Sequence, residues 1–261
     1  MRNDGLSWYN ALQGSYNLRI RSGLNLNTNY TFSKTMERNG FLDNLNNVMQ
    51  QGLSSNDRPH KFVFSMIGQL PVGRGRRWFN GSHGLASQLL SGWESTAIFQ
   101  IFSGKPWTLP GNVMYLKDAR NPNFTWNAAK VQPVQPCVLN WDNTNTITWE
   151  QYSQDYGCTT ANWLLVPNYN PRYTPNYDGR VRLQTVRLMD ASLNKTTRIG
   201  ERYSLQYRLE CFNVMNSFFI NTLQFNNDPT NANFGSILKA TVSAPQSNYP
   251  RQIQMGLKFL W

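Results

Sequence analysis

The chain has 261 residues, enough for one or two ordinary domains, so length alone does not decide the fold class. Charged residues make up only 15 % of the chain and aromatic residues 13 %. No run reaches 18 consecutive apolar residues, which excludes a transmembrane helix. The net charge of +11 is spread over short turns instead of one helix or ribbon, which argues against a nucleic-acid-binding protein.

Strict alternation of apolar and polar residues recurs along the chain and predicts β-strands with two different faces. In one clear example, Leu24, Leu26 and Tyr30 alternate with asparagines and threonine. Each segment has about the length of a tilted strand that crosses a membrane. The sequence predicts seven such strands, at 7–19, 23–34, 60–71, 91–103, 185–196, 202–214 and 252–261.

The two faces of these strands differ as the faces of a membrane barrel do. The apolar set carries aromatic residues near strand ends, as interfacial girdles require: Trp8, Tyr30, Phe32, Trp93, Tyr203 and Trp261. The polar set carries too many charges for a dry core: Lys61, Glu94, Asp190, Arg208 and Glu210. We therefore predict an all-β fold, a partial transmembrane antiparallel β-barrel of about seven strands of a larger barrel. A soluble β-sandwich is the competing interpretation.

The connections between the predicted strands alternate in length. Short turns join the strands at 20–22 and around Gly200, and a basic link of intermediate length covers 72–90. Long loops at 35–59, 104–184 and 215–250 are expected on the extracellular side. Seven strands that end in the periplasm start outside the cell, whereas single-chain bacterial barrels have an even number of strands. We therefore expect further strands and a signal peptide upstream of residue 1.

Several short motifs resemble those of a known family. Residues 30–34 (YTFSK) resemble a "YTxSK" strand, and residues 57–60 (DRPH) with 70–75 (LPVGRG) resemble a "DRPH … LPxGRG" segment. These motifs are similar to those of acidobacterial-type TonB-dependent receptors, the Oar-like group with a carboxypeptidase-regulatory-like N-terminal domain. The resemblance covers nearly the whole chain except 107–183. Further motifs in the same order are Gly92-Trp93, Ser103-Gly104-Lys105-Pro106, Arg208-Leu209-Glu210-Cys211-Phe212-Asn213, Phe234-Gly235 and Pro250-Arg251-Gln252-Ile253-Gln254.

The resemblance implies a 22-stranded barrel that is closed by a plug and imports a ligand with energy from an inner-membrane complex. The plug, the TonB-contacting segment and the first part of the barrel are absent from this sequence. The partners expected are outer-membrane lipid, the plug and upstream strands, the TonB complex, and the outer-membrane insertion machinery through the strand that ends at Trp261. A self-contained outer-membrane adhesin or structural barrel is the main alternative, with an eighth strand from 107–183. A soluble carbohydrate-binding β-sandwich is a further one.

No catalytic, cofactor or metal site is expected, because the sequence has no G-x-S-x-G elbow, P-loop, H-E-x-x-H or C-x-x-C motif. The candidate ligand site is the long loop, whose aromatic residues can stack on sugars or apolar ligands or can pack into a small core of their own. These aromatic residues are Trp107, Trp126, Trp141, Trp149, Tyr152, Tyr156 and Trp163. Arg208 and Glu210 share the lumenal face of one strand, where they can guide a ligand or pair structurally.

The three cysteines are expected to behave differently. Cys137 and Cys158 lie in the long loop, where an extracellular address favours a disulfide. Closing this loop of about twenty residues would stabilise it by roughly 3 kcal/mol in the chain-entropy model. Cys211 alternates with charged lumenal residues, so its thiol is expected to point toward lipid.

Overall fold

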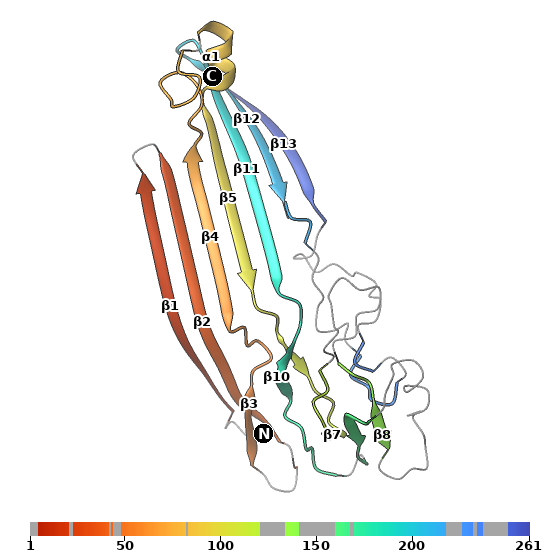
Figure 1. Ribbon diagram of the computed structural model, residues 1–261. Coiled ribbons are helices and arrows are strands. Elements are labelled where there is room, and N and C mark those ends of the chain that lie inside the picture. Colours follow the sequence, from red (N-terminus) through yellow and green to blue (C-terminus); the bar gives the residue numbers. More distant parts are fainter. Residues whose placement is uncertain are drawn as a thin grey trace.

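The computed structural model describes residues 5–20, 23–41, 43, 48–81, 83–120, 134–140, 160–167, 170–217, 226–231, 234–236 and 250–261. One long, twisted antiparallel sheet dominates the fold (Figure 1). Its seven main strands are β1 (Leu6–Ile20), β2 (Leu24–Phe41), β4 (His60–Gln69), β5 (Trp93–Phe102), β11 (Val186–Ile199), β12 (Tyr203–Phe212) and β13 (Gln252–Leu260). The seven predicted strands are confirmed.

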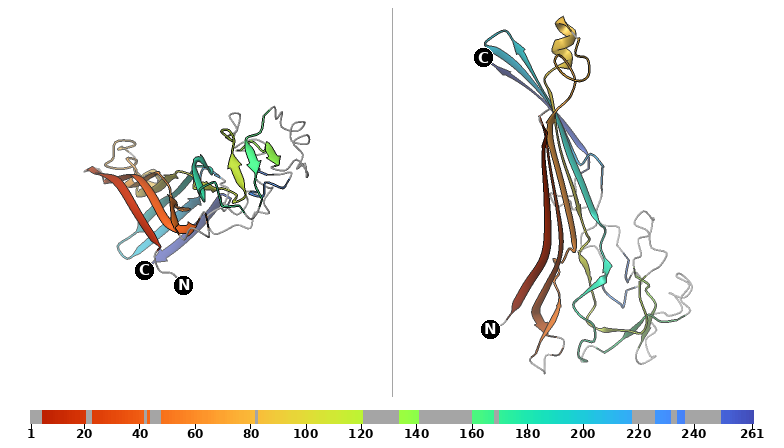
Figure 2. Two further views of the ribbon diagram at one scale, coloured as in Figure 1. Left: turned by 90° about the horizontal axis from the view of Figure 1, so that it is seen from below. Right: turned by 60° about the vertical axis from the view of Figure 1, so that its left-hand side comes forward.

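The strand order is β1-β2-β4-β5-β11-β12-β13, and every pair along it is antiparallel. β1 and β13 therefore form the two edges, and no pairing joins them among the described strands. Six antiparallel steps separate these edges, so β1 and β13 run in the same direction. The views in Figure 2 show the same curved, open sheet from below and from the side. The sheet is a half-barrel, as predicted.

β2 is longer than the sequence pattern predicts. Phe32 pairs with His60 at the start of β4, and β2 then continues beyond β4 as far as Phe41. There it pairs with β1 and with β3 (Met49–Leu53). The expected loop at 35–59 is thus partly strand. The pattern missed this extension because residues 33–41 show no regular alternation of apolar and polar side chains, although backbone pairing continues the ladder.

The basic link at 72–90 also contains an element that we did not predict. Helix α1 (Gly84–Leu90) follows a turn and leads through Gly92 into β5. Gly92 has φ +79, and a Cβ on it would lie 2.5 Å from the Thr196 carbonyl oxygen, so only glycine fits this close turn. No helix among the described ranges is long and apolar enough to cross a bilayer.

The long segment between β5 and β11 folds beside the end of the sheet that carries the long connections (Figure 1). β6 (Pro106–Thr108) pairs with β10 (Tyr177–Arg182), and β7 (Val113–Tyr115), β9 (Trp163–Leu165) and β8 (Val138–Asn140) form a small mixed sheet. We call residues 105–183 the loop unit. Its core is the main hydrophobic cluster among the described residues, to which Phe234 contributes from the segment between β12 and β13: Trp107, Leu109, Val113, Ala119, Val134, Val138, Trp163, Val181, Leu183 and Phe234.

Candidate functional site

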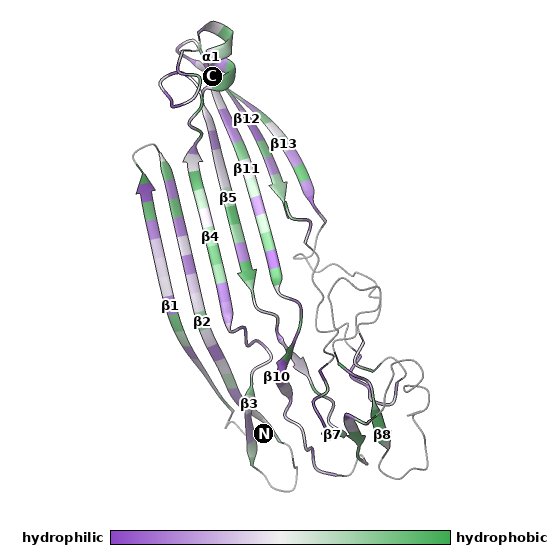
Figure 3. Cartoon of the chain, in the orientation of Figure 1, coloured by the Kyte–Doolittle hydropathy of each residue, from purple (hydrophilic) through white to green (hydrophobic). Residues whose placement is uncertain are grey.

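The strand registers assign every main-sheet side chain to one of two faces, because directly paired residues of antiparallel strands point to the same side. Leu209, for example, lies opposite both Leu193 and Met255. Tracing the pairs across the sheet gives an apolar face that includes Leu12, Leu26, Phe62, Phe64, Met66, Phe99, Met189, Leu193, Leu205, Tyr207, Leu209, Cys211, Met255, Leu257 and Phe259. Figure 3 shows the resulting alternation of hydrophobic and hydrophilic residues along the strands.

The opposite face is polar. It includes Asn17, Asn27, Ser65, Thr96, Gln100, Ser192, Asn194, Gln206, Gln254 and Lys258. The five charged residues predicted to point inward, Lys61, Glu94, Asp190, Arg208 and Glu210, all lie on this face. A hollow of about 490 Å³ lies over β1, β2, β4 and β5, lined mostly by polar-face residues such as Asn17, Asn27 and Ser65. The residues predicted to be lumenal therefore share one face, and that face carries a hollow over these four strands.

Exposure on the apolar face depends on position. Met255 and Leu257, on the edge strand β13, are about 70 % exposed (71 % and 69 %). Leu205, Tyr207 and Leu209 on β12 are only half-buried, because strands flank them on both sides. The aromatic residues predicted for the girdles lie on the apolar face as well, and Trp261 stacks beside Phe259 with ring centroids 6.2 Å apart.

Arg208 and Glu210 form an ion pair along one edge of this polar face, on β12. Glu210 also accepts a hydrogen bond from Gln254 on β13, so its carboxylate is held from two strands. This is the structural pairing that we set against a ligand-guiding role. Glu210 is mostly buried by these contacts, whereas most of the Arg208 side chain is exposed.

The loop unit packs two of the predicted ligand-contacting aromatics into its interior. Trp107 is 2 % exposed and Trp163 0 %, and their rings meet edge to face at 5.8 Å. Phe234 packs on both rings, and the Trp163 indole donates a hydrogen bond to the Gln135 carbonyl at 2.8 Å. For these two residues the structure supports core packing and not ligand contact. The other five, Trp126, Trp141, Trp149, Tyr152 and Tyr156, lie outside the described residues.

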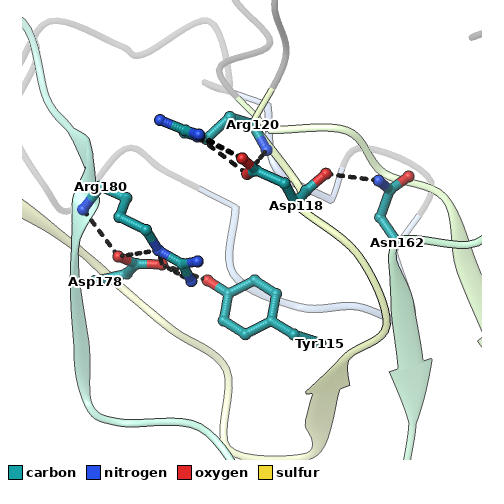
Figure 4. A network of polar contacts seen from close by, with 6 residues as sticks. All are labelled: Tyr115, Asp118, Arg120, Asn162, Asp178 and Arg180. Atoms are coloured by element: carbon teal, nitrogen blue, oxygen red, sulfur yellow. Dashed lines mark hydrogen bonds and ion pairs between the residues drawn. The ribbon is translucent and has the colours of Figure 1, made fainter.

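A polar network lies at the edge of this core, where β10 approaches β7 (Figure 4). The Tyr115 hydroxyl donates to Asp178 at 2.6 Å, and the Arg180 guanidinium pairs with the same carboxylate at 2.7 Å and lies 4.9 Å over the Tyr115 ring. Burial alone would raise the pKa of Asp178, but the hydrogen bonds from Arg180 and Tyr115 outweigh it and hold this pKa below its usual value. Burial, reinforced by Asp178, raises the pKa of Tyr115 far above its usual range.

A second ion pair, between Asp118 and Arg120, extends this network toward solvent. Hydrogen bonds from the Arg120 guanidinium lower the pKa of Asp118 to about 2. Asn162 donates to the Asp118 carbonyl at 2.8 Å and so ties the pair to the buried core beside Trp163 (Figure 4). The charges in this network are matched within the loop unit, which indicates a structural role for it.

A buried ion pair fastens the loop unit to the sheet. Asp57, just before β4, is 1 % exposed and accepts a hydrogen bond from Arg182 of β10 at 2.7 Å and another from the Thr35 backbone N–H of β2 at 2.8 Å. Arg182 also donates to the backbone carbonyls of Asp57 and Gly104, both at 3.2 Å. We call this arrangement the rim clasp. It joins β2, the segment before β4, the segment after β5 and β10.

The residues that flank the rim clasp come from the motifs that carry the family resemblance. Arg58 donates to the Ser103 carbonyl at 3.0 Å, and Lys105 donates to Asn56 at 2.9 Å. Gly104 packs directly on the Leu183 backbone: a Cβ on it would lie 1.6 Å from the Leu183 carbonyl oxygen, closer than any real contact. The DRPH and SGKP motifs therefore meet at the ends of the adjacent strands β4 and β5, and their spacing has a packing explanation in this chain.

The cysteines agree with the sequence expectations as far as they are described. Cys137 is disulfide-bonded, and Cys211 is a free thiol. Cys158, the expected partner of Cys137, lies outside the described residues. Cys211 lies opposite Ala191 and Ile253 on the apolar face, as predicted.

Comparison with known proteins assigns the family. The family described as "Outer membrane beta barrel domain" matches residues 1–254. The chain belongs to this family. It is an outer-membrane barrel protein of a bacterium, and its apolar face is the face that meets lipid. No match was found among curated proteins or among solved structures.

The dimensions of the apolar face fit this location. From Leu24 to Phe32, β2 takes eight residue steps, about 27 Å along the strand at ~3.4 Å per residue. A tilt of ~40° reduces that to about 21 Å, close to the ~25 Å apolar band of outer-membrane barrels. The last residues of β2, as far as Phe41, then project past this band.

Sequence reasoning missed the residues that hold the loop unit in place. Arg182 and Arg180 belong to an element that shows no long apolar alternation, and their partners Asp57 and Asp178 lie in segments predicted to be loops. The one available signal was that DRPH precedes one predicted strand and SGKP follows the next, which places both motifs at the same end of the sheet.

Proposed function

We propose that this chain is the C-terminal barrel segment of a TonB-dependent transporter that imports a ligand across the outer membrane and carries no catalytic activity of its own. In this proposal the long loops and the loop unit face outside the cell, and the short turns and α1 face the periplasm. The plug and the remaining strands come from the same protein, and the TonB complex acts on its N-terminal part.

The observation that carries the proposal is the direction of the two sheet edges. β1 and β13 run in the same direction, so the seven strands could close on themselves only through a parallel seam. Single-chain bacterial barrels are antiparallel throughout and have even strand numbers. Closure therefore requires an odd number of additional strands between β13 and β1.

A wide barrel with a polar wall fits transport. Barrels with many strands leave a lumen that is filled by water or by a plug, whereas small barrels are filled by their own side chains. The polar face carries charged residues that need water or plug partners, such as Lys61 and Glu94. Arg208 is also largely exposed despite its ion pair, so its remaining donors are free to face a plug or a passing ligand.

Crosslinking between the two edge strands, β1 and β13, tests the proposal. In a Cys211→Ser background of the full-length protein, Leu12→Cys on β1 and Leu257→Cys on β13 place two thiols on the same face of the two edge strands. The transporter proposal expects no intramolecular crosslink with a short thiol-reactive bifunctional crosslinker, such as a bis-maleimide, and co-purification with the periplasmic domain of TonB. A matched pair on adjacent strands, Leu209→Cys with Met255→Cys, should crosslink readily.

The opposite result would overturn the proposal. A mature membrane polypeptide of about 30 kDa with a β1–β13 crosslink would show a self-contained barrel, such as an adhesin. A chain that stays monodisperse without detergent would instead favour a soluble sandwich.

A further inference from the structure

Helix α1 lies against the apolar, lipid-facing side of the sheet at the short-turn end. The Lys195 side chain projects from the apolar face of β11, where its partner on β5 is Trp93. Its ammonium donates to the carbonyls of Gln88, Leu89 and Ser91 at 2.8, 2.9 and 2.7 Å, that is, to the C-terminal end of α1. The Trp93 indole also donates to the Leu89 carbonyl at 3.0 Å.

These contacts indicate where α1 lies relative to the bilayer. A lysine on the lipid face of a barrel strand is costly near the membrane midplane and tolerated near the interface. Here three helix carbonyls surround the Lys195 ammonium, which also lies 4.9 Å over the Trp93 ring. Tryptophan is the residue that marks the membrane–water interface. Lys195, Trp93 and α1 therefore lie together at the interface level.

The outer side of α1 is apolar and uncovered. Leu85 is 78 % exposed and Leu89 68 %, and their spacing of four residues places them on one side of the helix. A groove of about 340 Å³ runs between these leucines and Leu205 and Tyr207 of the lipid-facing side of β12. The exposed apolar surface of α1 is thus continuous with the surface that meets lipid.

The charged side chains of the segment that contains α1 are all basic. The segment 70–92 contains Arg74, Arg76 and Arg77 and no acidic residue. Arg76 turns toward the polar face, where it donates to Gln69. Arg74 is exposed, and its backbone N–H donates to the Ser91 hydroxyl at 3.1 Å, which places it beside the C-terminal end of α1. Arg77 is exposed as well.

We propose that the turn 72–91 is a membrane-interface anchor that binds a phospholipid of the periplasmic leaflet. One acyl chain occupies the groove between α1 and β12, and the phosphate group is bound by Arg74 and Arg77. The choice of leaflet rests on the proposed orientation of the barrel. The position of α1 at the membrane–water interface does not depend on that orientation. A phospholipid fits because it combines an apolar chain with an anionic group at the interface, which is the combination that this surface offers.

Quenching of fluorophores by brominated lipid tests whether α1 lies at the membrane–water interface. Full-length protein with Cys211→Ser is labelled at Leu85→Cys or Leu89→Cys with an environment-sensitive fluorophore and placed in vesicles that contain brominated phospholipid. Both labels should be quenched, as should one at Leu257→Cys on the lipid-facing edge. A label at Ser87→Cys, which lies on the inner side of α1 facing Glu94 and Arg198, should not be quenched.

The label at 257 separates failure of the anchor proposal from failure of the assignment of the lipid-facing side. Quenching at 257 without quenching at 85 and 89 would overturn the anchor and leave the barrel assignment intact. Absence of quenching at 257 would overturn the lipid-facing assignment itself, and the anchor with it.

Lipid titration tests the headgroup site. Native mass spectrometry of the full-length protein with phosphatidylglycerol should show about fivefold weaker retention of the lipid after Arg74→Gln, since one cationic residue near an anionic lipid surface contributes about that factor. Arg19→Gln, beside the 20–22 turn but on the polar face, should leave retention unchanged. Equal effects of the two substitutions would overturn the site, and so would tighter retention of lipid A than of phosphatidylglycerol.

Discussion

Replacement of Asp57 by asparagine should destabilise the protein strongly, because it removes one charge of a buried ion pair and keeps the shape. Asp57 is nearly inaccessible and Arg182 is about three-quarters buried, with 24 % of its side chain exposed. Breaking such a pair from one side costs roughly 3–5 kcal/mol, since the remaining charge is left without its partner. Arg182 keeps its two carbonyl acceptors, and the asparagine oxygen can still accept from the Thr35 N–H. We therefore expect the lower end, about 3 kcal/mol.

Urea titration of the folded full-length protein in detergent measures this effect. With a slope of ~2 kcal/mol per molar urea, 3 kcal/mol lowers the midpoint by about 1.5 M. The matched control is Asp118→Asn, which breaks an ion pair of similar geometry whose two side chains are both at least half exposed. This control should leave the midpoint unchanged, because exposed ion pairs contribute little.

A double replacement separates charge from packing. Asp57→Asn with Arg182→Met removes both charges and should recover part of the lost stability, as apolar replacement of whole buried pairs does elsewhere. If Asp57→Asn shifts the midpoint no more than Asp118→Asn does, the rim clasp is not a significant source of stability and our reasoning is wrong.

Three further predictions concern the lipid face, a close contact and pH. Leu257→Arg should lower stability in a refolding titration by roughly 2–4 kcal/mol if the site lies at mid-membrane, and by only about 0–1 kcal/mol if it lies near the interface level of Lys195, with which it is in register through Tyr207. Gln254→Arg on the polar face should be tolerated. Gly104→Ala should prevent correct assembly of the loop unit, seen as protease sensitivity, whereas Gly14→Ala meets open space and should be harmless. The lowered pKa of Asp178 means that its stabilising contribution is present above its unfolded pKa of ~3.9 and is lost as pH falls through its lower folded pKa. Below about pH 4 the loop unit should therefore loosen, and Asp178→Asn should flatten this pH dependence without moving the melting curve of the sheet; an unchanged acid profile in that variant would contradict the assignment.

The sequence was informative wherever one face of an element differs from the other. Alternation such as Leu205, Tyr207 and Leu209 with Gln206 and Arg208 gave both the strand and the direction of each side chain, because lipid and water impose opposite requirements on adjacent residues. The same reasoning placed Cys211 on the lipid face. The strands that project beyond the bilayer carry no such contrast, so the continuation of β2 to Phe41 was missed.

The loop unit could not be predicted for a different reason. Its core joins residues from distant parts of the chain, such as Trp107 and Phe234, and its strands are only three to six residues long. Short strands leave too few residues for periodicity to show. The pairing of Asp57 with Arg182 spans 125 residues and has no local signature. α1 was missed because seven residues are too few to display a helical period, although Leu85 and Leu89 hint at it.

The way the loop unit is attached makes it a replaceable module. The chain leaves the sheet after β5 and returns before β11, and these two segments are hydrogen-bonded neighbours: the Leu183 N–H donates to the Lys105 carbonyl at 2.9 Å, and β6 pairs with β10 just beyond. A ladder that continues across both segments brings their backbones to the spacing that a tight hairpin turn bridges. A different segment could therefore replace the residues between Lys105 and Leu183 while the β5–β11 pairing within the membrane wall is retained, provided that it supplies new partners for Asp57 and Phe234. The membrane-spanning strands can thus stay constant while the surface of the loop unit changes. Selection for a stable barrel then acts on different residues from selection for the surface of the loop unit.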